Sequence, residues 1–310
     1  MSDSWITVFG GTGFLGRRII ERLIGDGAPV RIVARNLHRL SGGNVHPDAT
    51  VERIQADVRD PDSVARAVAG ARGAVNAVGL YVARGGETFD SVHVTGAGNV
   101  AEQAAKAGVA RLVHISGIGV DSASESPYIR ARADGEAAVR VAFPAATILR
   151  PSVVFAPDDN FINLLLRMAR LLPALPLFGD GGKMLQPVFA GDVAEAAARA
   201  LDDPAAAGKT YELGGPVPYS YRNLLHLVTT LGGHRRPLLP VPFPIWEIQA
   251  RLAGILPNPP LTSDQVALMR HDNLASPDLP GLADLGITPT SLEAVLPDYP
   301  ALRAMGRGEG

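Results

Sequence analysis

The sequence contains no cysteine, little lysine and no long uninterrupted hydrophobic run. The absence of cysteine excludes structural disulfides, thiolate catalysis and cysteine-based metal sites, and it is compatible with a reducing compartment. The formal net charge of -2 provides no excess of basic residues to follow a phosphate backbone. We therefore expect no nucleic-acid partner.

The sequence favours neither export nor a membrane span. The N-terminus has no basic region followed by an apolar segment and a small-residue cleavage site, so we expect a cytoplasmic protein. The most apolar later stretch, 161–178, is interrupted by Arg167, Arg170, Pro173 and Pro176, which disfavours a spanning helix. Sparse lysine argues against anchoring to anionic lipid, and peripheral contact with an inner membrane stays open.

A glycine-rich turn near the N-terminus is the most informative motif. Gly10, Gly13 and Gly16 recur every third residue between a short apolar run and a segment with helical spacing of apolar residues. This pattern allows a tight turn, close backbone approach to a pyrophosphate and close packing of helix against strand. The anion would lie at the helix N-terminus. The sequence thus predicts a dinucleotide site built from Gly10, Thr12, Gly13, Phe14, Leu15 and Gly16.

Strand and helix patterns alternate through the first half of the chain. Strands are expected at 6–9, 30–34, 51–57, 73–78, 111–116 and 146–150, and helices at 15–23, 61–69, 94–107 and 131–142. Asp60 precedes Pro61 as a helix cap. This alternation predicts an α/β fold with a doubly wound parallel sheet, the Rossmann arrangement.

The pattern changes beyond Pro157, where apolar helices and proline-rich turns follow. We expect a Rossmann domain over 1–157 and a smaller, mostly helical cap over 158–310. The stretch 186–213 is expected to return to the Rossmann domain. Helices of the cap are expected at 163–172, 219–231 and 245–256, the last with Glu247 and Arg251 paired four residues apart.

The residue after the second strand bears on the choice of cofactor. An acidic residue there would accept a hydrogen bond from the adenosine ribose, whereas arginine favours a 2′-phosphate. This position holds Arg35, and Arg17 and Arg39 are further candidates for a cationic clamp. The sequence therefore favours NADPH over NADH, with a solvated basic cluster as the alternative.

The glycine turn, Ser116, Tyr128 and the strand end at Arg150 and Pro151 together resemble the short-chain dehydrogenase/reductase superfamily, in its extended or atypical branch. More narrowly, the chain resembles relatives of the nucleotide-binding accessory subunit of respiratory complex I and their epimerase-like bacterial homologues. The segments that carry this resemblance are 10–16, 179–182, 186–194, 211–216 and 261–266. The resemblance implies NADPH binding and, in the mitochondrial member, a structural role beside the quinone end of the complex.

The resemblance also places cofactor contacts at the ends of later strands. Asp57 and Val58 match positions that border the adenine in the family, and Ala77 and Val78 match positions where the cofactor riboses pass. Pro151 belongs to the same set of expected cofactor contacts. Each of these residues alone is also compatible with ordinary loop chemistry.

Catalytically active relatives combine a strand-end serine with a Tyr-x-x-x-Lys motif, and here Ser116 and Tyr128 match while the lysine is replaced by Arg132. The lysine holds the nicotinamide ribose and lowers the tyrosine pKa. Arginine keeps the charge but not the compact ammonium. In an ordinary structural interpretation, Arg132 pairs with Glu136, Tyr128 anchors its helix and Ser116 caps a loop.

Other candidate groups have simpler interpretations. His93 and His114 lack neighbours at metal-ligand spacing, so no metal site is expected. Asp158 and Asp159 are expected to cap the following helix. The apolar face around Trp246 would suit core or pocket packing, an isoprenoid-like small molecule, or a hydrophobic protein partner.

Three functions follow from these patterns. The first is an NADP(H)-binding protein whose cofactor is largely structural or regulatory, linked to respiratory complex I or quinone metabolism. The second is an active oxidoreductase or nucleotide-sugar epimerase or dehydratase that uses Ser116, Tyr128 and Arg132. The third is an interaction module that binds no nucleotide.

Overall fold

The computed structural model describes residues 5–39, 49–254 and 261–302. The chain forms two compact units. Unit 1 consists of Met1–Pro151, Ala190–Leu213 and Pro277–Thr288, and unit 2 of Ser152–Phe189, Gly214–Ser276 and Pro289–Gly310.

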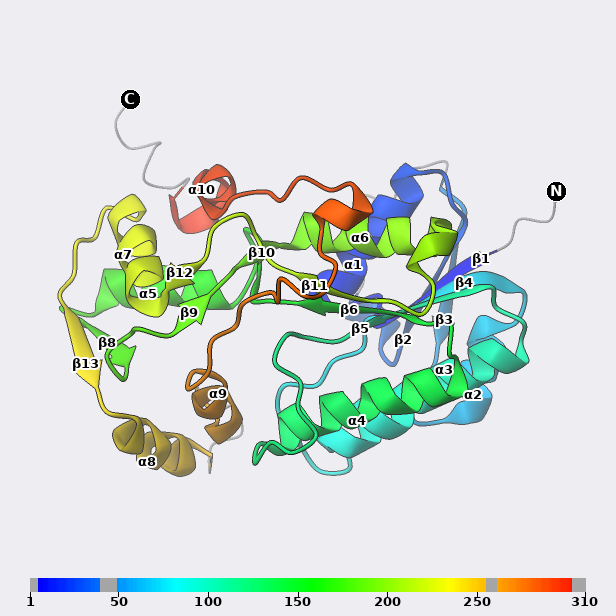
Figure 1. The fold of residues 1–310 in the computed structure, drawn as a ribbon, viewed down its shortest axis with the longest axis horizontal. Coiled ribbons are helices and arrows are strands. Elements are labelled where there is room, and N and C mark those ends of the chain that lie inside the picture. The colour runs from blue at the N-terminus through cyan, green and yellow to red at the C-terminus, as the bar shows by residue number, and fades with distance from the viewer. Residues whose placement is uncertain (1–4, 40–48, 255–260, 303–310) are drawn as a thin grey trace. The chain divides into compact units, whose positions relative to one another are not determined.

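Unit 1 is built on a seven-stranded sheet in which every neighbouring pair is parallel, in the order β11-β6-β5-β4-β1-β2-β3 (Figure 1). The strands are β1 (Trp5–Phe9), β2 (Val30–Ala34), β3 (Val51–Gln55), β4 (Ala71–Asn76), β5 (Arg111–Ile115), β6 (Thr147–Pro151) and β11 (Thr210–Leu213). Val8 pairs with Ile32 on one side and Val75 on the other, and Val8 and Val75 are fully buried. The predicted doubly wound sheet is confirmed.

Helices cover both faces of this sheet, as a buried parallel sheet requires. Figure 1 shows α1 (Phe14–Gly25) and α6 (Ala190–Asp202) on one face. The other face carries α2 (Pro61–Val68), α3 (Ala97–Lys106) and α4 (Pro127–Ala142). Asp60 caps α2 by accepting from Asp62 N, as the sequence predicts.

The order of the sheet reverses at β1, which lies between β2 and β4. In open α/β sheets ligands bind beyond the carboxyl ends of the strands at such a switch point. The glycine turn follows β1 directly. The fold therefore places the motif where a dinucleotide is expected.

Unit 2 is mostly helical, as expected, and also contains short strands. Its helices are α5 (Phe161–Leu171), α7 (Tyr221–Leu231), α8 (Phe243–Ala253), α9 (Ser263–Leu268) and α10 (Leu292–Val295). Three two-stranded pairs join them: β7 (Val154–Phe155) with β10 (Val188–Phe189), β8 (Leu175–Phe178) with β13 (Leu238–Val241), and β9 (Met184–Leu185) with β12 (Tyr219–Ser220). Most of these strands have two residues, too few to show a period of two in the sequence.

Several element boundaries differ from the sequence-based expectation. The stretch expected as a helix from 94 begins as a π-helical segment, Asp90–Gly96, before α3. Within the stretch expected to return to the Rossmann domain, helix α6 begins at Ala190, because the two preceding residues pair in β10. The helix expected from 219 begins at Tyr221, where Ser220 supplies the cap. Residues 255–256 of the helix expected over 245–256 lie outside the described residues.

The division of the chain also includes a segment that the sequence did not indicate. The expected boundary lay at 157 with a return over 186–213, whereas the compact units change at Pro151 and unit 1 also includes Pro277–Thr288. This last segment contacts the edge strand β11, where Glu212 N donates to Pro280 O at 3.0 Å. This segment has no regular hydrophobic period from which its position in unit 1 could be predicted.

None of the helices within the described ranges combines the length and apolar character that a membrane span requires.

Candidate dinucleotide site

The glycine turn has the geometry that the motif predicts. Gly10 has φ +76°, and a Cβ there would lie 2.7 Å from the carbonyl oxygen of Ala77. A Cβ at Gly16 would lie 2.2 Å from the carbonyl oxygen of Gly10. Gly10 thus allows the turn to approach β4, and Gly16 allows α1 to pack on the turn.

Gly13 is the N-cap residue of α1, and the helix start is open to an anion. No side chain caps the helix there, and its first turn contains no acidic residue. Gly13 is exposed, whereas Thr12, Phe14 and Leu15 are partly buried around it. Uncapped N–H groups at a helix start favour a pyrophosphate. The turn therefore fits the diphosphate of a dinucleotide.

Arg35 follows β2 and is half exposed, and its guanidinium forms an ion pair with Glu87. Of the other two arginines of the expected clamp, Arg17 is exposed on α1, and the side chain of Arg39 lies outside the described residues. Of the expected cationic clamp, only the side chains of Arg35 and Arg17 are among the described residues. Sequence reasoning did not identify Glu87 as the partner of Arg35.

The positions after β3 and β4 are ordered by local hydrogen bonds. Arg59 binds the Asp57 carboxylate through its side chain and its backbone N, and these bonds lower the pKa of Asp57. Val58 is buried, and its carbonyl accepts from Asn99 at 2.9 Å. The Asp57 carboxylate is thus engaged by a cation on its own loop.

Ala77 and Val78 extend β4 toward the glycine turn. Ala77 N donates to Phe9 O at 3.0 Å, and Val78 N donates to the side-chain oxygen of Asn76 at 3.2 Å. Pro151, at the end of β6, is buried, and its carbonyl accepts from Ile118 N at 3.1 Å. These contacts place the three expected positions on the carboxyl side of the sheet.

Tyr128 and Arg132 lie one turn apart on α4 and contact each other. Arg132 Nη1 donates to the Tyr128 hydroxyl at 2.8 Å, and the guanidinium carbon lies 5.5 Å from the ring centroid. On the other side, Arg132 approaches Gly117, where a Cβ would lie 3.2 Å from Nη2. The guanidinium therefore occupies the space between Tyr128 and the loop that follows β5.

Three further rings surround Tyr128, and sequence reasoning did not assign them to the site. Tyr81 stacks on it at 5.9 Å, while Phe89 and His93 meet it edge-on at 5.4 and 5.7 Å between centroids. Only 7% of Tyr128 is exposed, compared with 67% of Tyr81. The phenol thus lies in an aromatic enclosure supplied by the segment after β4.

Glu136 lies one turn beyond Arg132 and does not form the ion pair proposed for those two residues. Its carboxylate is bound at both oxygens by Arg150, at 2.9 and 2.8 Å, and by Arg140 at 3.1 Å. A bidentate partner on the adjacent strand holds the carboxylate more strongly than a helical neighbour would. Arg132 consequently forms a hydrogen bond with Tyr128 and not an ion pair with Glu136.

Ser116 is 3% exposed, and its backbone N donates to Leu149 O at 2.7 Å. Its hydroxyl has no hydrogen-bond partner of normal geometry among the described residues, yet it is close enough to Glu136 to help lower the pKa of that carboxyl. The structure thus brings Ser116, Arg132 and Tyr128 to one end of α4 and β5.

Two buried histidines lie beneath this site. Burial lowers the pKa of His93 to about 4 and that of His114 to about 3, and the nearby Arg132 acts in the same direction on both. His93 Nε2 lies 3.0 Å from Leu80 O, and His114 Nδ1 lies 3.2 Å from the side-chain nitrogen of Asn76. Both imidazoles are therefore neutral at neutral pH.

These histidines predict acid sensitivity. Below pH 6.5 the unfolded chain binds a proton at His114 that the folded chain does not, so stability falls with pH toward about 3. At pH 5 this linkage is worth about 2 kcal/mol. We expect His114→Gln to reduce by that amount the loss of unfolding free energy between pH 7 and pH 5 in urea titrations. His226→Gln, on an exposed position of α7, is the control, and an equal pH dependence in wild type and His114→Gln would contradict the assignment.

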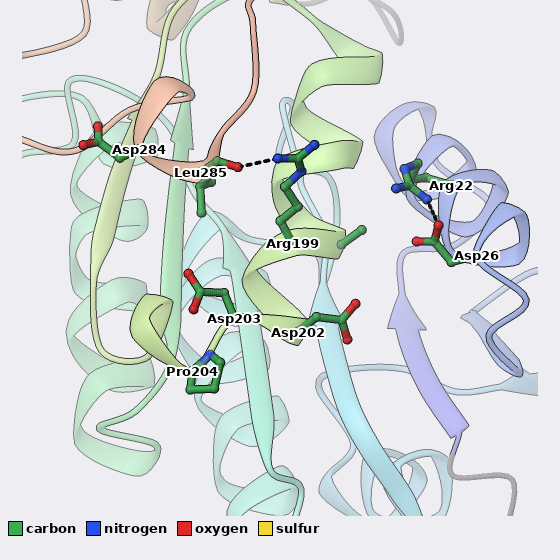
Figure 2. Close-up of a pocket in the computed structure, with 9 residues that line it drawn as sticks. Arg22, Asp26, Arg199, Asp202, Asp203, Pro204, Asp284 and Leu285 are labelled. Carbon is green, nitrogen blue, oxygen red and sulfur yellow. Dashed lines mark hydrogen bonds and ion pairs between the residues drawn. The ribbon is translucent and has the colours of Figure 1, made fainter.

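A separate cavity of about 500 Å³ lies where α1 ends (Figure 2). Asp26, Asp202, Asp203 and Asp284 line it with two arginines, of which Arg199 donates to Leu285 O at 2.8 Å. Because α1 starts at the glycine turn and ends here, the cavity lies at the opposite end of that helix. Its carboxylates would repel the phosphates of a dinucleotide, so we do not assign the cofactor to it.

The parallel sheet and the glycine turn at its switch point define a nicotinamide-dinucleotide-binding protein with a fold of the short-chain dehydrogenase/reductase type. The family model described as NAD(P)H-binding matches residues 10–204. The chain is 35% identical over 297 residues to mouse (Mus musculus) NADH dehydrogenase [ubiquinone] 1 alpha subcomplex subunit 9, mitochondrial, covering 93% of this chain and 77% of that protein. It therefore belongs to the NAD(P)H-binding family that contains this complex I subunit.

Two further similarities are informative. Ceramide reductase of Caulobacter vibrioides is 34% identical over 182 residues, which cover 58% of this chain and 55% of that protein. The solved structure of the Citrobacter sp. triphenylmethane reductase has a TM-score of 0.76 at 23% identity and covers 96% of this chain and 99% of that chain. At this identity the second similarity concerns the fold alone.

Proposed function

We propose that this protein holds NADP(H) as a resident cofactor with a structural or regulatory role, and that it does not turn the cofactor over rapidly. The observation that carries the proposal is the contact between Arg132 and Tyr128. The guanidinium donates to the phenol oxygen at 2.8 Å and reaches Gly117 on its other side. A planar fork held in this way lacks the compactness of the lysine ammonium that active relatives use at the ribose.

Arg35 supports the choice of NADP(H). It stands directly after β2, where a 2′-phosphate would meet a guanidinium and an NAD ribose would need an acid. Gly10, Gly13 and Gly16 would hold the pyrophosphate. Bound NADP(H) supplies a nicotinamide capable of hydride transfer, and this chain's residues orient and enclose it.

The mitochondrial relatives support a partner in a respiratory or quinone-linked assembly, since they are named as subunits of NADH–ubiquinone oxidoreductases. The exposed apolar residues Ile245, Ile248 and Leu252 on α8 suit a hydrophobic protein partner or an isoprenoid-like molecule. We place the protein in the cytoplasm, with peripheral contact at an inner membrane.

An active reductase is the second candidate. Ser116 and Tyr128 are both present at one site with a cation, Arg132, one helical turn from the phenol. The similarity to a ceramide reductase over 182 residues favours the same alternative. In that case Tyr128 would donate the proton, Ser116 would orient the substrate oxygen and Arg132 would hold the ribose.

A nucleotide-retention experiment separates these candidates. We expect the purified protein to release NADP(H) on denaturation and to leave bound NADPH unoxidised when carbonyl, sugar-nucleotide or quinone substrates are offered. We also expect Arg35→Gln to weaken NADPH binding about tenfold or more while changing NADH affinity less than about twofold, since a charge-assisted bidentate contact is lost. The retained nucleotide is identified by mass, and affinities are measured by nicotinamide fluorescence.

Arg72→Gln is the matched control, because it removes one charge and an exposed ion pair with Asp202. Substrate-dependent oxidation of NADPH that disappears in Tyr128→Phe would contradict the structural role and establish the reductase. If the protein binds neither NADPH nor NADH, both the structural role and the reductase activity are contradicted, and an interaction module that binds no nucleotide is the remaining hypothesis.

A further inference from the structure

The segment from Leu80 to His93 forms a closed loop whose tip lies against Arg35. At its base, the His93 imidazole contacts the Leu80 carbonyl at 3.0 Å. At its tip, Arg84 and Glu87 exchange two backbone hydrogen bonds of 2.8 Å, and Gly85 makes the turn with φ +53°. The loop therefore presents Glu87 from a defined tight turn.

Two arginines hold this tip against the ends of neighbouring strands. Arg35, after β2, pairs with the Glu87 carboxylate. Arg59, after β3, donates to Gly86 O at 3.2 Å while it also binds Asp57. The Glu87 carboxylate thus pairs with the Arg35 guanidinium, which in the proposed function binds the 2′-phosphate.

We propose that Glu87 is a specificity-determining residue that competes with the 2′-phosphate of NADP(H) for Arg35. This inference rests on the proposed NADP(H) site. Both partners of the ion pair are substantially exposed, at 50% for Arg35 and 32% for Glu87, so water screens the pair and little free energy opposes its exchange. A phosphate with more charge and more acceptor oxygens displaces the carboxylate, whereas NADH leaves the pair intact. Glu87 thereby weakens NADPH binding selectively.

The test measures dissociation constants of NADPH and NADH for the full-length protein and for Glu87→Gln. We expect the dissociation constant of NADPH to fall about threefold and that of NADH to change less than about twofold, as expected for loss of an exposed competing charge. Glu87→Ala should behave in the same way. The control is Glu102→Gln, which removes the same charge from another exposed pair, with Lys106 on α3, and should leave both constants unchanged.

A second arm uses the Arg35→Gln background. If Glu87 acts by occupying Arg35, Glu87→Gln no longer improves NADPH binding there. An improvement of the same size in that background would show simple repulsion of the phosphate and overturn the competition. Weaker NADH binding by Glu87→Gln would show that Glu87 accepts from the ribose hydroxyls, which also overturns it.

Failure of the inference is distinguishable from failure of the proposed function. Wild-type protein that prefers NADPH, combined with a Glu87→Gln variant of unchanged preference, overturns the role of Glu87 alone. Wild-type protein that binds neither nucleotide, or prefers NADH, overturns the proposed NADP(H) site and the inference with it.

Discussion

Gly13→Val is expected to weaken the binding of both NADPH and NADH by about 100-fold or more, because a branched side chain would stand where the pyrophosphate approaches the start of α1. The fold should accommodate the substitution with a small shift of the turn at Gly10. Gly13 is exposed with φ -78°, and its Cβ would lie 3.1 Å from Gly10 O without other close neighbours. Titrations with both nucleotides, together with urea unfolding of the free protein, measure the two effects separately.

Gly25→Val is the matched control for this prediction. Gly25 ends the same helix, and a Cβ there would meet no atom within 4 Å. We expect it to leave both affinities unchanged. Unaltered nucleotide binding by Gly13→Val would show that the cofactor does not lie on the glycine turn, against the central assignment of the site.

The largest loss of stability is expected from Glu136→Ala. The carboxylate is 1% exposed and is bound at both oxygens by Arg150, with Arg140 as a further partner. Removal of this buried carboxylate would leave Arg150 with only Glu212 among the described residues, at 3.3 Å, so we expect a loss of about 3 kcal/mol in the free energy of unfolding. Urea titration measures it. Glu102→Gln, which breaks an exposed pair on α3, should cost less than about 0.5 kcal/mol.

The pH dependence of this contribution has a definite sign. Burial acts to raise the pKa of Glu136, but hydrogen bonds and charges from Arg150 outweigh it, so the pKa lies below the ordinary value of 4.5. The stabilisation is therefore complete above pH 4.5 and disappears as the pH falls through the lowered pKa. The difference between wild type and Glu136→Gln should shrink in that acidic range. If Glu136→Ala lowered the free energy of unfolding by less than about 1 kcal/mol at pH 7, the cost of desolvating the Glu136 carboxylate would offset its attraction to Arg150, against this prediction.

Much of unit 1 could be predicted because its strands are short segments rich in apolar residues that alternate with helical patterns. Val30–Ala34 is buried along its whole length, and Asp60 caps α2 through its side chain as expected. Helix α4 begins at Pro127 and not at the expected 131, because Ser126 supplies its cap. Unit 2 was less predictable, because most of its strands have two residues and pair with distant partners. Their formation depends on tertiary packing, which local sequence does not specify.

The candidate site shows the same division. The resemblance to the short-chain dehydrogenase/reductase superfamily pointed to Ser116, Tyr128 and Arg132 as candidate site residues, and Tyr128 and Arg132 lie one turn apart on α4. Spacing could not decide between Glu136 and Tyr128 as the partner of Arg132, since both lie four residues away. Arg150, on β6, binds both oxygens of the Glu136 carboxylate, so Arg132 donates to Tyr128 instead.

The surroundings of the site depend on longer loops. Glu87 lies 52 residues from Arg35 in the sequence, and its approach depends on a turn at Gly85. Glu247 likewise pairs with Arg270 and not with Arg251, contrary to the helical spacing, because α9 packs against α8. Long-range pairs of this kind have no local sequence signal.

The placement of Pro277–Thr288 in unit 1 bears on how the protein is made. The edge strand β11 and helix α6 donate hydrogen bonds to this late segment, at Pro280 O and Leu285 O. A nascent chain emerges N-terminus first, and contacts between residues far apart in sequence form slowly. The glycine turn and its strands can therefore assemble early on the ribosome, while the far edge of the sheet stays incomplete until Pro277–Thr288 has been synthesised.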